Sequence, residues 1–288
     1  MYKLIGLLSP NQMVRRSSSM LGRYQRYRCY ADTPHTDLTS KQVVVQGNEN
    51  EQRVRVRRAR PSDVPRVLRF VREHARWAWP SLVSAPVAPT AASQLVLADY
   101  VSRALAQGHT MVAEQVGSRR GWLQVRGLAL GAAVCPWDAA VLERWARCMR
   151  CARSRRLMHF TAHCLRAPGL HDKYRVHNIL QVIMILPPDA QHNPEIVQVL
   201  ARSAIQRGRE VGYPLLRFDV TNEHVAQALE GLQLTKEWHM SYDIMPESMQ
   251  EKESGASPAA AVPNPKERKM SFITVYTSFT SPENVKVS

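Results

Sequence analysis

The chain has 288 residues, 44% of them apolar and 22% charged, with a formal net charge of +15 and a pI near 10.1. This length allows one or two domains with a sizeable core, and the apolar fraction is ordinary for a folded protein. No run approaches the roughly 20 apolar residues of a membrane-spanning helix. We therefore expect a folded, basic monomer without a transmembrane segment.

The N-terminus has an unusual composition. Residues 1–30 contain six basic residues, several serines and no acidic residue. This is typical of a mitochondrial transit peptide, whereas a secretory signal would need a longer apolar core. We predict that residues 1–30 are a transit peptide cleaved after Tyr30, with the mature protein in the mitochondrial matrix. The alternative is a basic tail on a cytoplasmic protein. Residues 31–52 have the composition of a polar linker.

The next segments alternate between strand and helix patterns. Apolar and basic residues alternate around Val54–Val56, which predicts a first strand. Ser62 is suited to cap a helix whose apolar side begins at Val64. Residues 79–90 are rich in Pro and Ala and indicate a loop. A second helix with a stripe from Leu97 to Leu105 ends at Gly108, and residues 110–135 predict a hairpin around 117–121.

A basic helix is predicted from about Asp138 to Arg156. Few acids oppose its arginines, which are Arg144, Arg147, Arg150, Arg153, Arg155 and Arg156. Such a row either lies on a solvated face or contacts an acidic protein or RNA, and both interpretations stay open.

Cysteine and histidine residues in the same region have a spacing superficially like that of zinc ligands. They are Cys148, Cys151, His159, His163 and Cys164. Cys148 continues the apolar stripe of the predicted helix, so buried reduced thiols are favoured over a metal site. We expect no metal.

Residues 179–220 form a strand, turn, helix and strand pattern. Ile179–Leu186 is an apolar run of strand length, which predicts a strand buried on both faces. From Pro194 the apolar residues recur with helical spacing as far as Gly212, and strand character returns at 213–220. A turn of this kind directs backbone N–H groups and the positive end of a helix dipole at whatever fills it. Further strands are predicted at 238–244 and 271–279, joined by a low-complexity segment, 247–269, that we expect to be disordered, and residues 281–288 form a tail.

The order of these elements resembles the GNAT superfamily of N-acetyltransferases, and within it the insect-type arylalkylamine N-acetyltransferases. The resemblance covers residues 53–280 and rests on VRVRRARPSDVPRVLRFVREH, HDKYRVHNILQVIMIL and GYPLLRFDVTNEHVAQALEGLQL, in that order. It implies an α/β GNAT acyl-CoA N-acyltransferase fold, with a mixed central sheet flanked by helices. It also implies acetyl-CoA as the cofactor of an active member and a small amine as substrate. The pantetheine arm would lie along the strand that contains Ile183 and Ile185.

The cofactor turn departs from the family pattern, which is usually Arg-Gly-x-Gly-x-Ala. The matching residues are His192, Asn193, Pro194, Glu195, Ile196 and Val197, so both glycines are replaced. Pro194 lacks an N–H group. The Glu195 carboxylate would lie near the pyrophosphate, where like charges about 4 Å apart cost on the order of 4 kcal/mol per pair before screening. These residues favour a self-capped helix without a bound anion.

The general base also departs from the family pattern, in which an acidic residue precedes Pro and Leu after the first helix. Trp79 stands at that position, and indole has no acceptor for a proton. His224 or His74, acting through water, are the substitute candidates. We therefore predict a GNAT-fold protein with weak or lost acetyl-CoA binding and catalysis and a non-catalytic binding role. The alternatives are an active acetyl-CoA-dependent N-acetyltransferase of small amines and a basic mitochondrial nucleic-acid-associated factor.

Overall fold

The structure is a computed structural model that describes residues 41–45, 52–78, 91–116, 124–148, 152–241 and 272–280. Its strands are β1 (Lys41–Val45), β2 (Gln52–Arg58), β3 (Met111–Val116), β4 (Gln124–Val134), β5 (Ile179–Ile185), β6 (Leu215–Val220), β7 (Thr235–Ser241) and β8 (Phe272–Phe279). Its helices are η1 (Pro61–Asp63), α2 (Val64–Ala78), α4 (Ala91–Ala106), α5 (Asp138–Cys148), α6 (Ala152–Arg166), α7 (Leu170–Tyr174), α8 (Pro188–Gln191), α9 (Pro194–Val211) and α10 (Glu223–Glu230). None of these helices is long and apolar enough to cross a bilayer.

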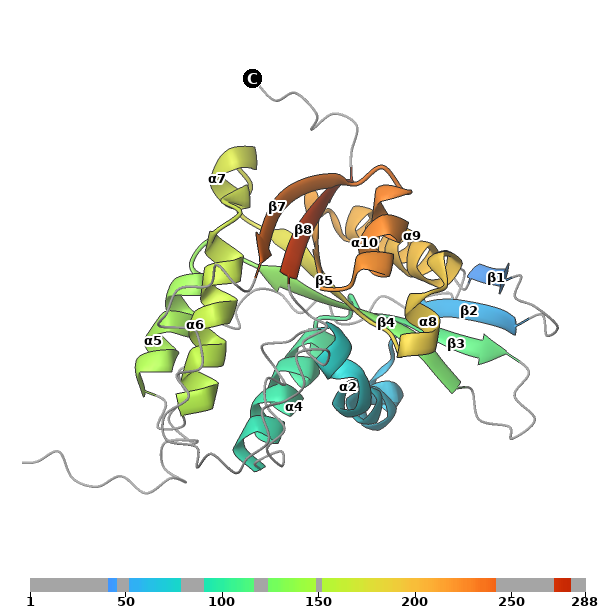
Figure 1. Cartoon of the computed structure of the whole chain (residues 1–288), viewed down its shortest axis with the longest axis horizontal. Helices are drawn as coiled ribbons and strands as arrows, with labels where there is room; N and C mark the ends of the chain where they lie inside the picture. Colours follow the sequence, from blue (N-terminus) through green and yellow to red (C-terminus); the bar gives the residue numbers. More distant parts are fainter. Residues whose placement is uncertain are drawn as a thin grey trace, which may run out of the picture. The chain divides into compact units, whose positions relative to one another are not determined.

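The described strands form one mixed sheet in the order β1-β2-β3-β4-β5-β6-β8-β7 (Figure 1). Neighbouring strands are antiparallel except for β5 and β6, which run parallel and are joined through α9. Their register begins at Ile179 with Leu215 and ends at Ile183 with Asp219. The last two residues of β5 have no partner in β6, so the two strands part at their carboxyl ends.

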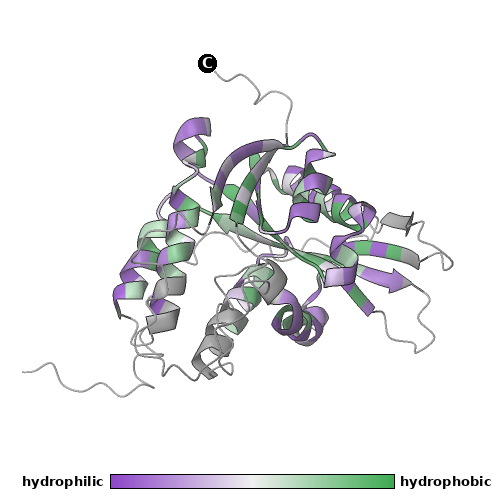
Figure 2. Cartoon of the chain, viewed as in Figure 1, coloured by the Kyte–Doolittle hydropathy of each residue, from purple (hydrophilic) through white to green (hydrophobic). Residues whose placement is uncertain are grey.

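Helices cover both faces of the sheet, with α9 and α10 on one face and α2 and α4 on the other (Figure 1). All seven residues of β5 are buried, which confirms the prediction of a strand covered on both sides. Figure 2 shows the same division, because the central strands are hydrophobic while the outer sides of the helices are mainly hydrophilic. This mixed, doubly covered sheet confirms the predicted α/β fold class.

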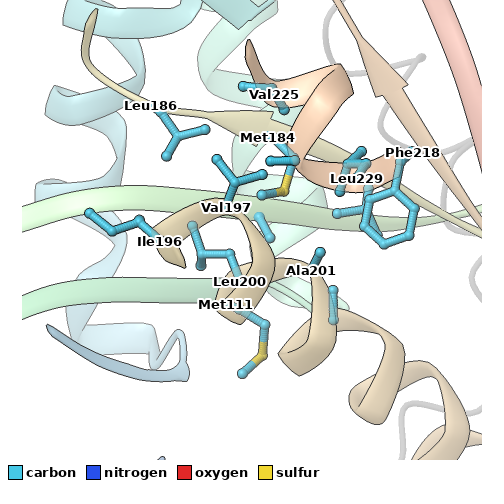
Figure 3. Packing of buried hydrophobic residues seen from close by; sticks show 14 of the residues in the cluster. Met111, Met184, Leu186, Ile196, Val197, Leu200, Ala201, Phe218, Val225 and Leu229 are labelled. Carbon is cyan, nitrogen blue, oxygen red and sulfur yellow. The ribbon is translucent and has the colours of Figure 1, made fainter. Parts of the chain in front are cut away.

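Helix α9 supplies most of the contacts between its layer and the sheet. Ile196, Val197 and Leu200 are at most 3% exposed, and Figure 3 shows them gathered with Met184 of β5. Complete burial of one such side chain stabilises the fold by about 1.5–3 kcal/mol. The helix ends at Gly212, whose φ of 84° belongs to the left-handed region that favours glycine. The predicted helix boundaries at Pro194 and Gly212 are confirmed.

Three local predictions differ from the structure. The polar segment 31–52, expected to be a linker, contains β1, because its β-branched residues pair antiparallel with the edge of β2. The basic helix expected over 138–156 is two helices, α5 and α6, and residues 149–151 lie outside the described part. Ser62 lies inside η1 instead of capping α2, and at the start of η1 the Asp63 carboxylate accepts from the Arg60 amide at 2.7 Å. Residues 1–30, predicted to be a transit peptide, and the segment 247–269 also lie outside the described residues.

A charged network joins β2, β3 and the start of α2. The Arg57 guanidinium lies 2.7 Å from both the Asp63 and the Glu114 carboxylates, and Arg66 also contacts both acids. Glu114 is fully buried and Asp63 is 6% exposed. Burial alone would raise the pKa of Asp63, but hydrogen bonds from Arg57 and the Arg60 amide, with the charges of Arg57 and Arg66, lower it to about 2.

This lowered pKa predicts acid sensitivity that an Asp63→Asn variant does not share. The Asp63 carboxylate stabilises the fold fully above its unfolded pKa of 3.8, and this contribution is lost as pH falls from about 4 to about 2. After allowance for solvent screening it amounts to about 1–2 kcal/mol. We expect urea unfolding to show wild type more stable than Asp63→Asn at pH 5, with the difference shrinking towards pH 2. A difference independent of pH would contradict the assignment.

Candidate functional site

The carboxyl ends of β5 and β6 form the place where this fold can take a ligand. Beyond Ile183 and Asp219 the strands part, and α9 and α10 begin from the segments that follow them. Crevices outside the carboxyl ends of parallel strands are the usual ligand sites of open α/β sheets. The N-termini of two helices also bring positive dipole ends to this edge.

Gln191, at the end of α8, bridges the two diverging segments. Its side chain is buried, and its Nε2 donates to the Leu186 carbonyl, just after β5, at 2.9 Å. Its Oε1 accepts from Asn222 Nδ2, just after β6, at 2.8 Å. Asn222 in turn caps α10, because its Oδ1 accepts from the amides of His224 and Val225 at 2.9 and 3.2 Å. Side chains of this protein therefore satisfy the polar groups of the gap.

The space left beside Gln191 is small. A hollow between the strand ends is large enough for roughly one water molecule. Its lining residues are Met184, Leu186, Gln191, Asp219, Val220, Thr221, Asn222 and Val225. A thioester arm would have to displace Gln191 and Asn222 to enter between the strands. The residues present therefore do not fit a pantetheine chain in this arrangement.

The N-terminus of α9 is capped by its own sequence. Asn193 Oδ1 accepts from the amides of Glu195 and Ile196 at 3.0 and 3.4 Å. The amide of Val197 donates to the Asn193 carbonyl at 3.5 Å, and the Asn193 amide donates to Ala190. Pro194 has no amide hydrogen to offer. The amides that would bind a phosphate group have partners within the chain, which agrees with the self-capped helix predicted from the sequence.

The other predicted cofactor residues separate into buried and exposed positions. Ile183 and Ile185 are buried among side chains of α2 and α4, and Ile196 and Val197 belong to α9 and are buried in the core that it forms with the sheet. His192 and Glu195 are exposed. The two groups of residues thus lie in the core and at the surface, without an open channel between them in the described part of the chain.

Of the substitute bases, the structure brings only His224 to the gap. Its ring is 4.2 Å from that of His192, edge to face, and both histidines are exposed. His74 lies on α2, on the other face of the sheet, with its ring 4.6 Å from Phe70. Trp79 lies outside the described residues. The carboxylate that lines the hollow is Asp219, and its oxygens already accept from Arg217 and Gln181.

A buried polar cluster on β6 was missed in the sequence. Arg217 Nε donates to Asp219 Oδ1 at 2.7 Å, and Gln181 also donates to that carboxylate. Arg217 Nη2 donates to the Cys164 carbonyl at 2.7 Å, so the guanidinium satisfies the C-terminal end of α6. Burial raises the pKa of the Cys164 thiol. The signal available in the sequence was the pair of opposite charges, Arg217 and Asp219, in an otherwise apolar strand. In the structure Arg217 holds the end of α6 to the sheet.

The cysteine residues for which burial was expected, and the arginine row, lie only partly within the described residues. Cys164 is buried as expected, but Cys148 is exposed, so burial was wrong for that residue, and Cys151 lies outside the described residues. The described residues contain no group of three or more potential metal ligands. Arg144, Arg147 and Arg155 are exposed; Arg150 lies outside the described residues, as do the side chains of Arg153 and Arg156.

Solved structures with the same fold exist, although no model of a known protein family and no curated protein matches the sequence. Arylalkylamine N-acetyltransferase 7 of the yellow fever mosquito has a TM-score of 0.63 at 12% identity, over 88% of this chain and 99% of that one. For Drosophila melanogaster polyamine N-acetyltransferase the TM-score is 0.58 at 15% identity, and for a mosquito arylalkylamine N-acetyltransferase-like protein 5b it is 0.59 at 14% identity. Each of these two matches covers 78% of this chain and 99% of the other. The chain therefore has the GNAT N-acetyltransferase fold.

The cap at Asn193 can be tested by substitution. Asn193→Ala removes the acceptor for two amides and should lower the free energy of unfolding by about 0.5–2 kcal/mol, whereas Asn193→Asp should keep most of it. Urea unfolding of the two variants measures the difference. Equal stability of wild type and Asn193→Ala would show that the amides are not held by this side chain.

Proposed function

We propose that this protein uses the N-acetyltransferase fold as a non-catalytic binding domain and does not form a productive complex with acetyl-CoA. The observation that carries the proposal is the bridge from the Leu186 carbonyl through Gln191 to Asn222, which fills the gap between β5 and β6. The self-capped start of α9 supports it, because the amides available for a pyrophosphate are already bonded.

The free energies involved support the same conclusion. Opening the gap would break two buried hydrogen bonds of Gln191, and each polar group left without a partner costs about 1–3 kcal/mol. Displacing the Asn193 cap would cost about 0.5–2 kcal/mol more. Glu195 adds repulsion toward a pyrophosphate. Together these costs are comparable to the roughly 8 kcal/mol of a micromolar complex.

An active N-acetyltransferase of small amines, with acetyl-CoA as its cofactor, is the second candidate. The names of the similar structures favour it, since they are enzymes named for arylalkylamines and polyamines. It would require Gln191 to leave the gap and an exposed histidine such as His224 to act as base through water.

Two sequence-based predictions remain. A role with RNA or an acidic protein would use the exposed Arg144 and Arg147 of α5. Location in the mitochondrial matrix rests on residues 1–30, which lie outside the described part of the chain.

Calorimetric titration with acetyl-CoA separates the first two candidates. We expect no binding tighter than about 1 mM, which corresponds to about −4 kcal/mol. The double variant Asn193→Gly with Glu195→Gly should bind more tightly than wild type, because it frees two amides and removes the carboxylate. The single variant Glu223→Gln, at the start of α10, serves as a control for a general change of charge. Low-micromolar binding by the wild type would contradict the proposal and favour the enzyme.

A further inference from the structure

A second polar cluster lies on the α9 face of the sheet, near the C-terminal end of α9. His109 precedes β3, is 8% exposed, and lies edge to face with Tyr213 at a ring distance of 5.3 Å. Its Nε2 and the Tyr213 hydroxyl share a hydrogen bond at 3.3 Å. Arg207 of α9 and Arg58 at the end of β2 act electrostatically on this imidazole. We call Arg58, His109 and Arg207 the His109 cluster.

Two buried nitrogens of this cluster have no partner among the described residues. They are His109 Nδ1 and Arg207 Nε. The Arg207 side chain is only 18% exposed, and its Nη1 reaches Glu210 at 3.5 Å, at the limit of a hydrogen bond. If Tyr213 donates to His109 Nε2, the imidazole proton lies on Nδ1, so both nitrogens are donors that lack an acceptor. Buried donors of this kind are normally satisfied by protein, water or ligand.

The charges around the imidazole are unbalanced. Burial, then the charges of Arg207 and Arg58, lowers the pKa of His109 to about 4, so it is neutral at pH 7. Burial and the charge of Arg58 also lower the pKa of Arg207. Burial raises the pKa of Tyr213 and the pKa of Cys135, so both side chains are neutral. Cys135 also acts electrostatically on Tyr213. Glu210 is the one acid among the described residues that acts on Arg207.

We propose that the His109 cluster binds a small oxyanion of the phosphate type, held by Arg58, Arg207 and His109 Nδ1. An oxyanion supplies several acceptors to donors that have none, and guanidinium groups bind phosphate through two parallel N–H bonds. Arg58 is exposed at the end of β2. The anion also offsets the mutual repulsion of the two arginines.

This position is separate from the cofactor turn of the fold. Arg207 lies about 20 Å from Pro194 along the axis of α9, because an α-helix rises about 1.5 Å per residue. The proposal therefore does not depend on whether acetyl-CoA binds at the other end of the helix. An acetyl-CoA titration and a phosphate titration can fail independently.

Thermal unfolding in inorganic phosphate tests the proposal, with sodium chloride at the same ionic strength as reference. Because phosphate strengthens apolar burial in any protein, the variants carry the comparison. We expect the thermal midpoint of wild type to rise with phosphate concentration as a bound ligand requires. Arg207→Met, which keeps the side-chain stem, should lose most of this rise, whereas Arg202→Gln, an exposed control on the same helix, should keep it. Equal rises in wild type and Arg207→Met would overturn the proposal.

Histidine ring NMR of the wild-type protein keeps the test independent of how the variants fold. A bound anion should raise the pH at which His109 titrates, relative to chloride. An unchanged His109 titration in saturating phosphate would contradict the site. Glycerol 2-phosphate distinguishes the sources: the same effect supports a phosphate monoester as the natural ligand, and an effect of inorganic phosphate alone supports the free ion.

Discussion

The end of the parallel pairing between β5 and β6 is the constraint on which the rest of the structure depends. Beyond Ile183 and Asp219 the two strands part, and buried backbone groups beyond that point must find partners other than each other. Here the chain provides them itself. Gln191 occupies the gap and joins Leu186 to Asn222, and Asn222 and Asn193 cap the two helices that begin there. The gap where the two strands part is thus bridged by the side chains of Gln191 and Asn222, while Asn193 caps the neighbouring helix.

Helix α9 consequently has two ends of different chemical character. Its N-terminus is capped by Asn193, followed by Pro194 and the exposed carboxylate of Glu195, so it offers little to an anion. Its C-terminal turns carry Arg207, whose Nε, like Nδ1 of His109, has no partner among the described residues. On the opposite face, the buried pair of Arg217 and Asp219 fixes the end of α6 against the sheet. Among the described residues, donors without acceptors therefore lie near the C-terminal end of α9, whereas the amides of Glu195 and Ile196 at its start are bonded within the chain.

Periodicity predicted the elements whose burial is regular, and it failed where the deciding contact is distant in sequence. The apolar run of β5 and the helical spacing from Pro194 to Gly212 were sufficient for strand and helix. The cap at Asn193 was also predictable, because a cap acts within three residues. The bridge from Gln191 to Asn222 was not, since the partners are 31 residues apart and both are ordinary loop residues in the sequence. Strand β1 was missed because polar residues surround its three valines in the sequence. In the structure it lies at the edge of the sheet and pairs only with β2.

Solution NMR of the gap in the presence of acetyl-CoA tests the central claim most directly. The side-chain amide resonances of Gln191 and Asn222 report whether the bridge is intact, and the backbone amides of Glu195 and Ile196 report whether the Asn193 cap is intact. If the gap is closed by its own side chains, none of these resonances moves when acetyl-CoA is added to millimolar concentration. A concerted shift of all four, accompanied by a shift at Leu186, would show that the cofactor enters between the strands and would contradict the account.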